Sequence, residues 1–332
     1  MAKHANISFF VPHLGCSNRC SFCNQNSITG KVSLPDKAEI DTAVEIAKKS
    51  PKYSAQDTEI AFFGGSFTAI DREYMMYLLS CANVYVKDGT VKGIRVSTRP
   101  DAINCRVLDI LKQYGVTAIE LGAQSTDENV LLLNKRGHSA EDIFKVSALI
   151  KSYGFSLGLQ MMTGLYGATA EKDAKTVEDF IKIAPDTVRI YPTIVLKKTA
   201  LALLVEKGEY QPPSLEESIE NCCEYYKRFN DNGISVIRLG LHHIDEEDFV
   251  AGPWHPAFSQ LCMSKICFEK VKEKLSNNTG DYTVYVNPAE ISTFVGQKRS
   301  NLTKFKDMGF NVRISGDENI SNDDFRIERE VK

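Results

Sequence analysis

Residues 13–24 read HLGCSNRCSFCN and place three cysteines, Cys16, Cys20 and Cys23, in a C-x3-C-x2-C spacing. A cube of four irons normally takes four cysteines, so three alone predict a [4Fe–4S] cluster with one iron open to a further ligand. A structural zinc site would need four closed ligands, usually in two separated pairs, which this run does not offer. Two alternatives stay open at this point: His13 as a fourth ligand, and three unrelated core cysteines.

The 332-residue chain has the composition of an ordinary globular protein and is long enough for a large domain and a small one. No stretch approaches the roughly 18 apolar residues of a membrane span, and the first residues lack the apolar core of a signal peptide. We therefore expect a cytoplasmic protein with no membrane partner. A net charge of −3 neither favours nor excludes nucleic acid. Six further cysteines are expected to be reduced and buried: Cys81, Cys105, Cys222, Cys223, Cys262 and Cys267.

Short apolar runs alternate with helical patterns over residues 1–244, which is typical of repeated βα units and a mostly parallel sheet. The rhythm stops near residue 245, before the eight units of a complete barrel are reached. In parallel barrels the chemistry lies at the carboxyl ends of the strands, and the cysteine run follows the first strand. The predicted strands are 7–11, 59–63, 93–97, 118–121, 155–161, 187–191 and 235–239. The predicted helices are 36–49, 71–86, 104–114, 140–153, 170–183 and 215–232.

Polar side chains interrupt or end several of these apolar strands. Burying an ionised group costs several kcal/mol unless it is paired, so a lumen filled only by packing would not use them. The pattern favours a polar, ligand-binding lumen, with Glu120, Tyr191 and Arg238 as candidate substrate contacts. The alternative is that some of these residues face outward or form internal ion pairs. The full set is Glu120, Gln124, Gln160, Arg189, Tyr191 and Arg238.

The second predicted strand ends in FFGGSFT, residues 62–68. Two adjacent glycines, Gly64 and Gly65, let the backbone approach a ligand closely and expose its amides. Such pairs are common in turns and predict little alone. Here the pair indicates a ligand site because it lies one βα unit after the cysteines.

Together these features resemble the radical S-adenosylmethionine (SAM) superfamily, whose signature is the C-x3-C-x2-C spacing followed by the glycine motif. The resemblance implies an α/β fold with a partial (β/α)6 barrel. It also implies a [4Fe–4S] cluster on Cys16, Cys20 and Cys23, with SAM chelating the open iron, so His13 is not expected to ligate. An electron from a donor such as ferredoxin or flavodoxin would cleave SAM and release a 5′-deoxyadenosyl radical.

Four further segments resemble one subgroup, the catalytic subunit of Elongator and the oxygen-independent coproporphyrinogen oxidases. They are STRPD at 97–101, ELGAQS at 120–125, NKRGHS at 134–139 and IYPT at 190–193. The resemblance runs from about residue 7 to 242. It places Gln124 and Arg136 against SAM, with Arg136 near its carboxylate. Two SAM-contacting acids of the relatives correspond to Ser97 and Gln160, which can still hydrogen-bond ribose. The other implied SAM contacts are Phe22, Gly64, Gly65 and Ser66.

Residues 245–332 are expected to form a small α+β domain. We find no pyrophosphate-binding loop there and expect no acetyltransferase domain of the kind that follows in the Elongator subunit. The predicted order is a strand at 283–286, a helix at 289–295, a loop at 296–299, a helix at 301–308 and a strand at 310–314. This order resembles a degenerate KH RNA-binding domain, whose G-x-x-G loop clamps a nucleic-acid backbone. Arg299 replaces the second glycine, and Lys298, Arg299 and Lys304 are candidate RNA contacts. The alternative is a small packing subdomain with solvated lysines.

The sequence therefore favours a radical SAM enzyme that modifies RNA, with tRNA as the preferred substrate. One alternative is a small-molecule radical SAM oxidoreductase related to coproporphyrinogen oxidation. The other is a non-catalytic RNA-binding module whose cluster is structural or redox-sensing.

Overall fold

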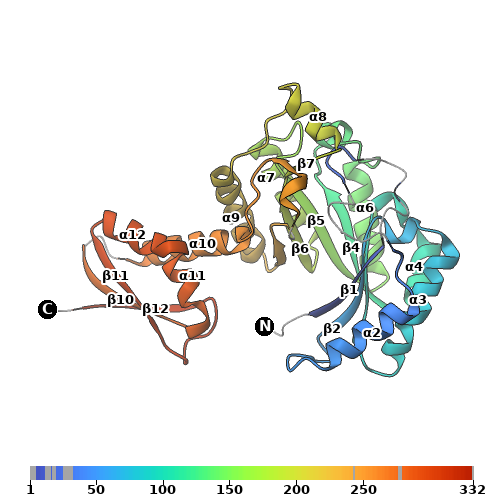
Figure 1. The fold of residues 1–332 in the computed structure, drawn as a ribbon, viewed down its shortest axis with the longest axis horizontal. Helices are drawn as coiled ribbons and strands as arrows, with labels where there is room; N and C mark the ends of the chain where they lie inside the picture. Colours follow the sequence, from blue (N-terminus) through green and yellow to red (C-terminus); the bar gives the residue numbers. More distant parts are fainter. Residues whose placement is uncertain are drawn as a thin grey trace. The chain divides into compact units, whose positions relative to one another are not determined.

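The computed structural model describes residues 5–11, 16, 20–24, 33–241, 244–275 and 279–330. His13 lies outside these residues. The chain divides into two compact units (Figure 1). The first comprises Met1–Ser218 and Tyr225–Trp254, and the second comprises Ile219–Glu224 and His255–Lys332.

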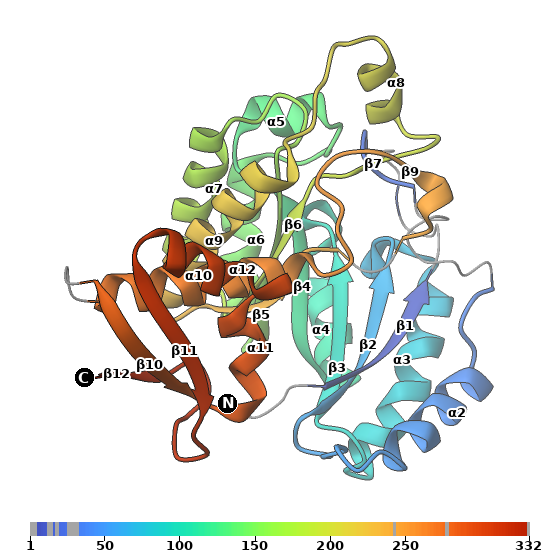
Figure 2. The same cartoon turned by 60° about the vertical axis from the view of Figure 1, so that its left-hand side comes forward.

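The first unit is built on one sheet of seven parallel strands in the order β1-β2-β3-β4-β5-β6-β8. All seven predicted strands are present, so the predicted partial parallel barrel is confirmed. The helices that connect these strands pack on one face of the sheet (Figures 1 and 2). The strands are β1 (Ala5–Val11), β2 (Thr58–Gly64), β3 (Gly93–Thr98), β4 (Val116–Gln124), β5 (Ser156–Thr163), β6 (Thr187–Pro192) and β8 (Ser235–Leu239).

The helices between these strands begin where the sequence provides capping side chains. Asp36 and Asp71 accept hydrogen bonds from the backbone of the first turn, and Ser214 with Glu217 forms a capping box. A short helix, α5, was not predicted. The helices are α2 (Lys37–Lys48), α3 (Arg72–Lys87), α4 (Cys105–Gln113), α5 (Glu128–Leu133), α6 (Ala140–Ser152), α7 (Ala170–Ile183) and α9 (Leu215–Asp231).

Side chains alternate between the two faces of the sheet, as they must on strands. The face under the helices carries buried apolar residues such as Phe9, Phe62 and Leu121. The opposite, concave face carries every charged residue of the seven strands. These residues are Glu59, Arg95, Glu120, Arg189 and Arg238.

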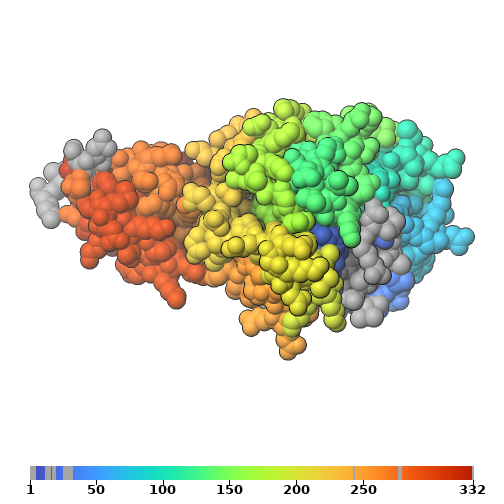
Figure 3. All heavy atoms as spheres, turned by 90° about the horizontal axis from the view of Figure 1, so that it is seen from above, coloured from blue at the N-terminus to red at the C-terminus, as the bar shows by residue number. Residues whose placement is uncertain are grey.

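Several unpredicted elements lie beyond the carboxyl ends of the strands. Strand β7 (Val195–Leu196) pairs antiparallel with β9 (Phe249–Ala251), and helix α8 (Ala200–Glu206) follows β7. Figure 3 looks onto this end of the first unit, with α8 in yellow. None of the helices in the described ranges is long and apolar enough to cross a membrane.

The second unit packs three helices on a three-stranded sheet of order β11-β10-β12. Strand β10 runs parallel to β11 and antiparallel to β12. The predicted strand–helix–loop–helix–strand order is present, and α10 and β12 are additions to it. The elements are α10 (Phe258–Lys274), β10 (Gly280–Val286), α11 (Ile291–Val295), α12 (Ser300–Asp307), β11 (Phe310–Gly316) and β12 (Phe325–Arg329).

The remaining cysteines mostly behave as expected. Five of the six are buried, but Cys105 is exposed because it is the first residue of α4 and precedes the buried face of that helix. The expectation that Cys105 is buried was therefore wrong.

We predict that Phe305→Ala destabilises the second unit by about 3–5 kcal/mol, because it removes a fully buried ring. Phe305 is 1% exposed, and its ring centroid lies 4.6 Å from that of Phe268. Denaturant unfolding monitored by circular dichroism measures the change. Met308→Ala is the control, since Met308 is 40% exposed and should cost far less. Equal losses for the two variants would contradict this account of the core.

Candidate functional site

The described part of the cysteine run is held in place by residues distant in the sequence. The Ser21 hydroxyl donates to Asn134 Oδ1 at 2.5 Å, and the Ser21 amide donates to the Asn134 carbonyl at 3.3 Å. Ser21 also accepts a backbone hydrogen bond from Leu201 at 2.9 Å, while Asn24 Nδ2 donates to the Lys197 carbonyl at 2.9 Å. The cysteine run is thus attached to the segment after α5, to the residue that follows β7 and to the first turn of α8.

Arg136 connects this run to the end of β4. Its Nη1 donates to Cys20 Sγ at 2.9 Å, and its Nη2 donates to the Gly122 carbonyl. The same guanidinium lies 5.8 Å from the centre of the Phe22 ring, which packs on the apolar cluster around Met162. Two predicted SAM contacts, Phe22 and Arg136, are therefore brought together at one of the three cysteines.

A second arginine, Arg99, lies near Cys16. Its guanidinium binds Asp101 through two hydrogen bonds of 2.8 Å. The hydrogen bonds to Asp101 are the main reason that the pKa of Arg99 is raised, and the nearby Cys16 thiol raises this pKa further. Positive charge beside two of the cysteines complements the negative charge that thiolate ligands would carry.

Among the described residues, no three His, Cys, Asp or Glu side chains are gathered closely enough to hold a metal ion. Cys16 is exposed, and Cys20 and Cys23 are partly buried. The three thiols lie on one loop beyond β1, but their joint role as ligands stays a prediction.

The glycine pair lies at the end of β2, beside the end of β1. Gly64 has a φ of +118°, and a Cβ there would lie 2.6 Å from the Val11 carbonyl oxygen, so a side chain is excluded on both counts. The Gly65 amide donates to the same carbonyl at 3.3 Å. Ser66, another predicted SAM contact, is fully buried and bonds Thr98 Oγ1 at 2.7 Å. It therefore joins the ends of β2 and β3 instead of presenting its hydroxyl to the open face.

Three buried polar atoms at the end of β4 have no hydrogen-bond partner among the described residues. They are Gln124 Oε1, Arg136 Nε and His138 Nδ1. Gln124 also has a φ of +71°, which is strained for a residue with a side chain. Unpaired buried atoms and backbone strain are typical of sites built for a ligand. Gly122 leaves room for this arrangement, because a Cβ there would lie 3.1 Å from Gln124 Nε2.

The concave face below this cluster is crossed by a chain of ion pairs. Arg95 donates to Glu59 at 2.8 Å and to Glu120 at 3.2 Å, and Arg189 donates to both oxygens of Glu120 at 2.7 and 2.8 Å. Burial alone would raise the pKa of Glu120, but the Arg189 and Arg95 charges overcome it and hold that pKa below its ordinary value. Of the two interpretations of Glu120 left open by the sequence, this geometry favours the internal ion pair.

Ser97 and Gln160 lie next to this chain. Gln160 Nε2 is within hydrogen-bond distance of Ser97 Oγ at 3.2 Å and of Glu120 Oε2 at 2.9 Å. Tyr191 lies two residues beyond Arg189 on β6, and burial raises the pKa of its hydroxyl. Arg238 is the register partner of Arg189 on β8. The candidate ribose contacts and the candidate substrate contacts thus share one face of the sheet.

In the second unit, Lys298 and Arg299 form an exposed turn between α11 and α12. Both have left-handed backbone conformations, with φ of +51° and +64°. Lys304 lies on α12 with its Nζ 5.3 Å from the centre of the Phe268 ring. The three predicted RNA contacts are therefore exposed. In a G-x-x-G loop glycines can adopt the left-handed conformation, whereas here the charged residues Lys298 and Arg299 adopt it.

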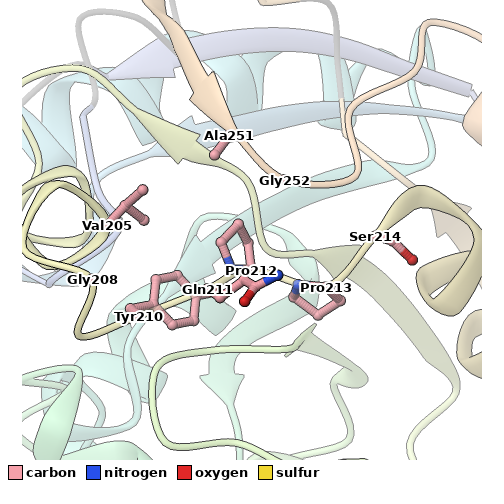
Figure 4. Close-up of a pocket in the computed structure, with 9 residues that line it drawn as sticks. All are labelled: Val205, Gly208, Tyr210, Gln211, Pro212, Pro213, Ser214, Ala251 and Gly252. Carbon is pink, nitrogen blue, oxygen red and sulfur yellow. The ribbon is translucent and has the colours of Figure 1, made fainter.

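One pocket of the first unit, of about 500 Å³, lies apart from these residues (Figure 4). Its lining is mostly apolar and contains none of the predicted site residues. The lining includes Val205, Tyr210, Pro212, Pro213, Ala251 and Gly252.

The residues that position the site carry no local signal in the sequence. Asn134 lies in the NKRGHS segment, but nothing in the sequence shows that its partner is Ser21. Glu59 and Arg95 each lie alone in an apolar strand, and only the strand register brings them together.

Comparison with known proteins gives the class. Residues 10–180 match the radical SAM superfamily model, and residues 185–266 match the radical SAM C-terminal domain. The chain therefore belongs to the radical SAM superfamily and is an enzyme of that class. This confirms the resemblance found in the cysteine spacing.

Within the superfamily, the chain is similar to the Elongator group. It is 30% identical over 207 residues to the tRNA uridine(34) acetyltransferase of Methanocaldococcus infernus, covering 56% of this chain and 38% of that protein. It is 30% identical over 188 residues to human Elongator complex protein 3, covering 51% of this chain and 34% of that protein. The chain thus spans less than half the length of either relative. The solved structure of Methanocaldococcus infernus Elp3 shares the fold, with a TM-score of 0.62, 22% identity and coverage of 82% of this chain and 64% of that chain.

We predict that His138 makes the unfolding free energy fall in mild acid. Burial, with the nearby Arg136 charge, lowers the pKa of His138 to about 4 from the ordinary 6.5. Between these values the unfolded chain takes up a proton that the folded chain does not, so stability is lost as the pH falls. Between pH ~7.5 and pH ~5 the loss should be about 2 kcal/mol. His138→Gln should remove this part of the pH dependence in denaturant titrations, and an unchanged slope would contradict the assignment.

Proposed function

We propose that this enzyme reductively cleaves SAM at a [4Fe–4S] cluster held by Cys16, Cys20 and Cys23 and uses the resulting radical to modify RNA, with tRNA as the substrate. When bound, the cluster and SAM would together supply the one-electron chemistry that yields a 5′-deoxyadenosyl radical. A cytoplasmic location and an electron donor of the ferredoxin or flavodoxin type complete the proposal.

The observation that carries the proposal is the position of Arg136. Its Nη1 lies against Cys20 Sγ, and its buried Nε has no partner among the described residues. Because arginine suits a carboxylate, this position supports Arg136 as the proposed contact of the SAM carboxylate beside the proposed cluster. The orphaned Gln124 Oε1 supports this, since a bound ligand would give it a hydrogen-bond donor.

The other contacts divide between direct and indirect roles. Gly64 and Gly65 offer a backbone edge for the SAM amino group, and Ser97 with Gln160 offers polar atoms for the ribose. Ser66 acts through Thr98 and the Arg99 amide, to which it is hydrogen-bonded, and holds the glycine loop in place.

RNA as the substrate is supported by two observations. One of the relatives with 30% identity is named tRNA uridine(34) acetyltransferase, and the second unit presents an exposed basic turn between two helices. Lys298 and Arg299 on this turn, with Lys304 on α12, are the proposed phosphate contacts. A small-molecule oxidoreductase would not need this turn.

We predict that Cys20→Ala loses most of its cluster and lowers SAM cleavage by at least about a hundredfold, because one of three thiolate ligands is gone. The full-length protein would be reconstituted with iron and sulfide without oxygen and then reduced. Bound iron and 5′-deoxyadenosine would be measured. Cys105→Ala, an exposed cysteine on α4, is the matched control and should behave as wild type. An intact cluster with bound SAM but no 5′-deoxyadenosine in the wild-type protein would refute the enzymatic proposal.

We predict that the double variant Lys298→Asn, Arg299→Asn binds tRNA more weakly and with a shallower salt dependence, by about one to two units of slope. Asparagine tolerates the left-handed backbone of both positions, so the charges are removed with the turn intact. Filter binding of tRNA over a range of salt concentrations measures both quantities.

Lys270→Asn, Lys272→Asn is the matched control, since it removes two charges from α10. Equal losses in both double variants would show a general charge effect and count against the turn. A nucleoside missing from tRNA only in cells lacking this protein would identify the modification.

A further inference from the structure

We propose that Arg238, with the Tyr191 hydroxyl beside it, is an oxyanion-binding site on the concave face of the sheet that takes a phosphate or carboxylate group of the substrate. This inference rests on the proposed function, because it concerns the substrate of the same site.

The strands of the concave face carry one more positive than negative charge. The seven strands carry five charged residues, two acidic and three basic, all on this face. Four of these residues form a chain of ion pairs with one another: Glu59, Arg95, Glu120 and Arg189. Two carboxylates balance two guanidinium groups there, which leaves the charge of Arg238 as the surplus.

Arg238 forms no ion pair with an Asp or Glu of the described residues, and the other residues of the chain include neither type. Its side-chain hydrogen bonds go to two backbone carbonyls, Nε to Gly240 at 3.1 Å and Nη2 to Leu241 at 2.9 Å. These bonds turn the guanidinium toward the carboxyl end of β8. Burial and, to a smaller extent, the neighbouring Arg189 charge lower the pKa of Arg238, as expected for a cation without a counter-charge.

A partly buried guanidinium without a carboxylate is costly unless an anion is supplied. The backbone carbonyls fix Nε and Nη2, while Nη1 and the second Nη2 hydrogen have no partner among the described residues and can donate to two oxygens of one phosphate or carboxylate group. Tyr191 contributes a hydroxyl from the adjacent strand β6, where it is hydrogen-bonded to Arg189 and its charged neighbours are Arg189, Glu120 and Arg238. Arg189 is already neutralised by Glu120, so it lines the site without competing for the same anion.

Phosphate and carboxylate share this chemistry but come from different substrates. With RNA as the proposed substrate, a backbone phosphate of the reacting nucleotide is the expected occupant. A small-molecule substrate would present a carboxylate instead. Inorganic phosphate and acetate therefore serve as the two probes.

The test is calorimetric titration of the full-length protein with phosphate and with acetate, in matched ionic strength. We expect saturable binding of phosphate in preference to acetate. Arg238→Met, which keeps most of the side-chain volume, should weaken binding by about tenfold or more. Tyr191→Phe should weaken it less, and Arg238→Lys should retain part of it. Arg106→Met, an exposed arginine on α4, is the matched control and should bind as wild type.

Tighter binding of acetate than of phosphate would indicate a carboxylate group as the occupant of the site and would contradict the expected phosphate. Unchanged binding in Arg238→Met, or no saturable binding in the wild type, would overturn the proposal. Melting temperatures of the variants separate lost binding from lost folding. SAM cleavage without substrate should be equal in the wild type and in the Arg106→Met control. Its absence from both would refute the proposed function and leave the anion site to be judged on binding alone.

Discussion

The concave face of the first unit depends on one carboxylate, Glu120. It is 1% exposed and bonds Arg95, Arg189 and Gln160 at once. A sheet that buried apolar residues on both faces would close its lumen, whereas these paired charges keep one face polar without leaving a buried charge uncompensated. Removing the carboxylate alone would leave two guanidinium groups facing each other. The polar lumen, the candidate ribose contacts and the surplus charge of Arg238 all follow from this arrangement.

A second constraint acts at the carboxyl ends of the strands. Asn134 and Arg136, from the segment after α5, both reach the cysteine run that follows β1, through Ser21 and Cys20. The same short segment therefore positions the loop and supplies the candidate carboxylate ligand. This arrangement connects β1 and β4, which are not neighbours in the sheet.

The sequence predicts those elements whose pattern of residues lies within a short stretch of the chain. The seven strands, the capped helices and the loop motifs each show a pattern within a few residues, and so the sheet and the edge that carries the candidate site could be predicted. Helix α10 was not predicted because Ala257 at its start provides no capping side chain, and β12 was not predicted because only Phe325 of its residues is buried. The ion pairs and the Ser21–Asn134 contact could not be predicted, since they join residues 25 to 113 positions apart whose proximity depends on the three-dimensional register.

The attachment of the cysteine run to α8 has a thermodynamic consequence. Ser21 and Asn24 are hydrogen-bonded to Leu201 and Lys197. The free energy of ordering the cysteine loop is therefore coupled to the free energy of ordering the segment around α8. Any ligand that fixes the loop must stabilise that segment by the same amount by which the segment strengthens the ligand's binding. The segment that borders the open end of the sheet therefore reports on occupancy at the cysteines: it should exchange its amide hydrogens more slowly whenever the loop is loaded.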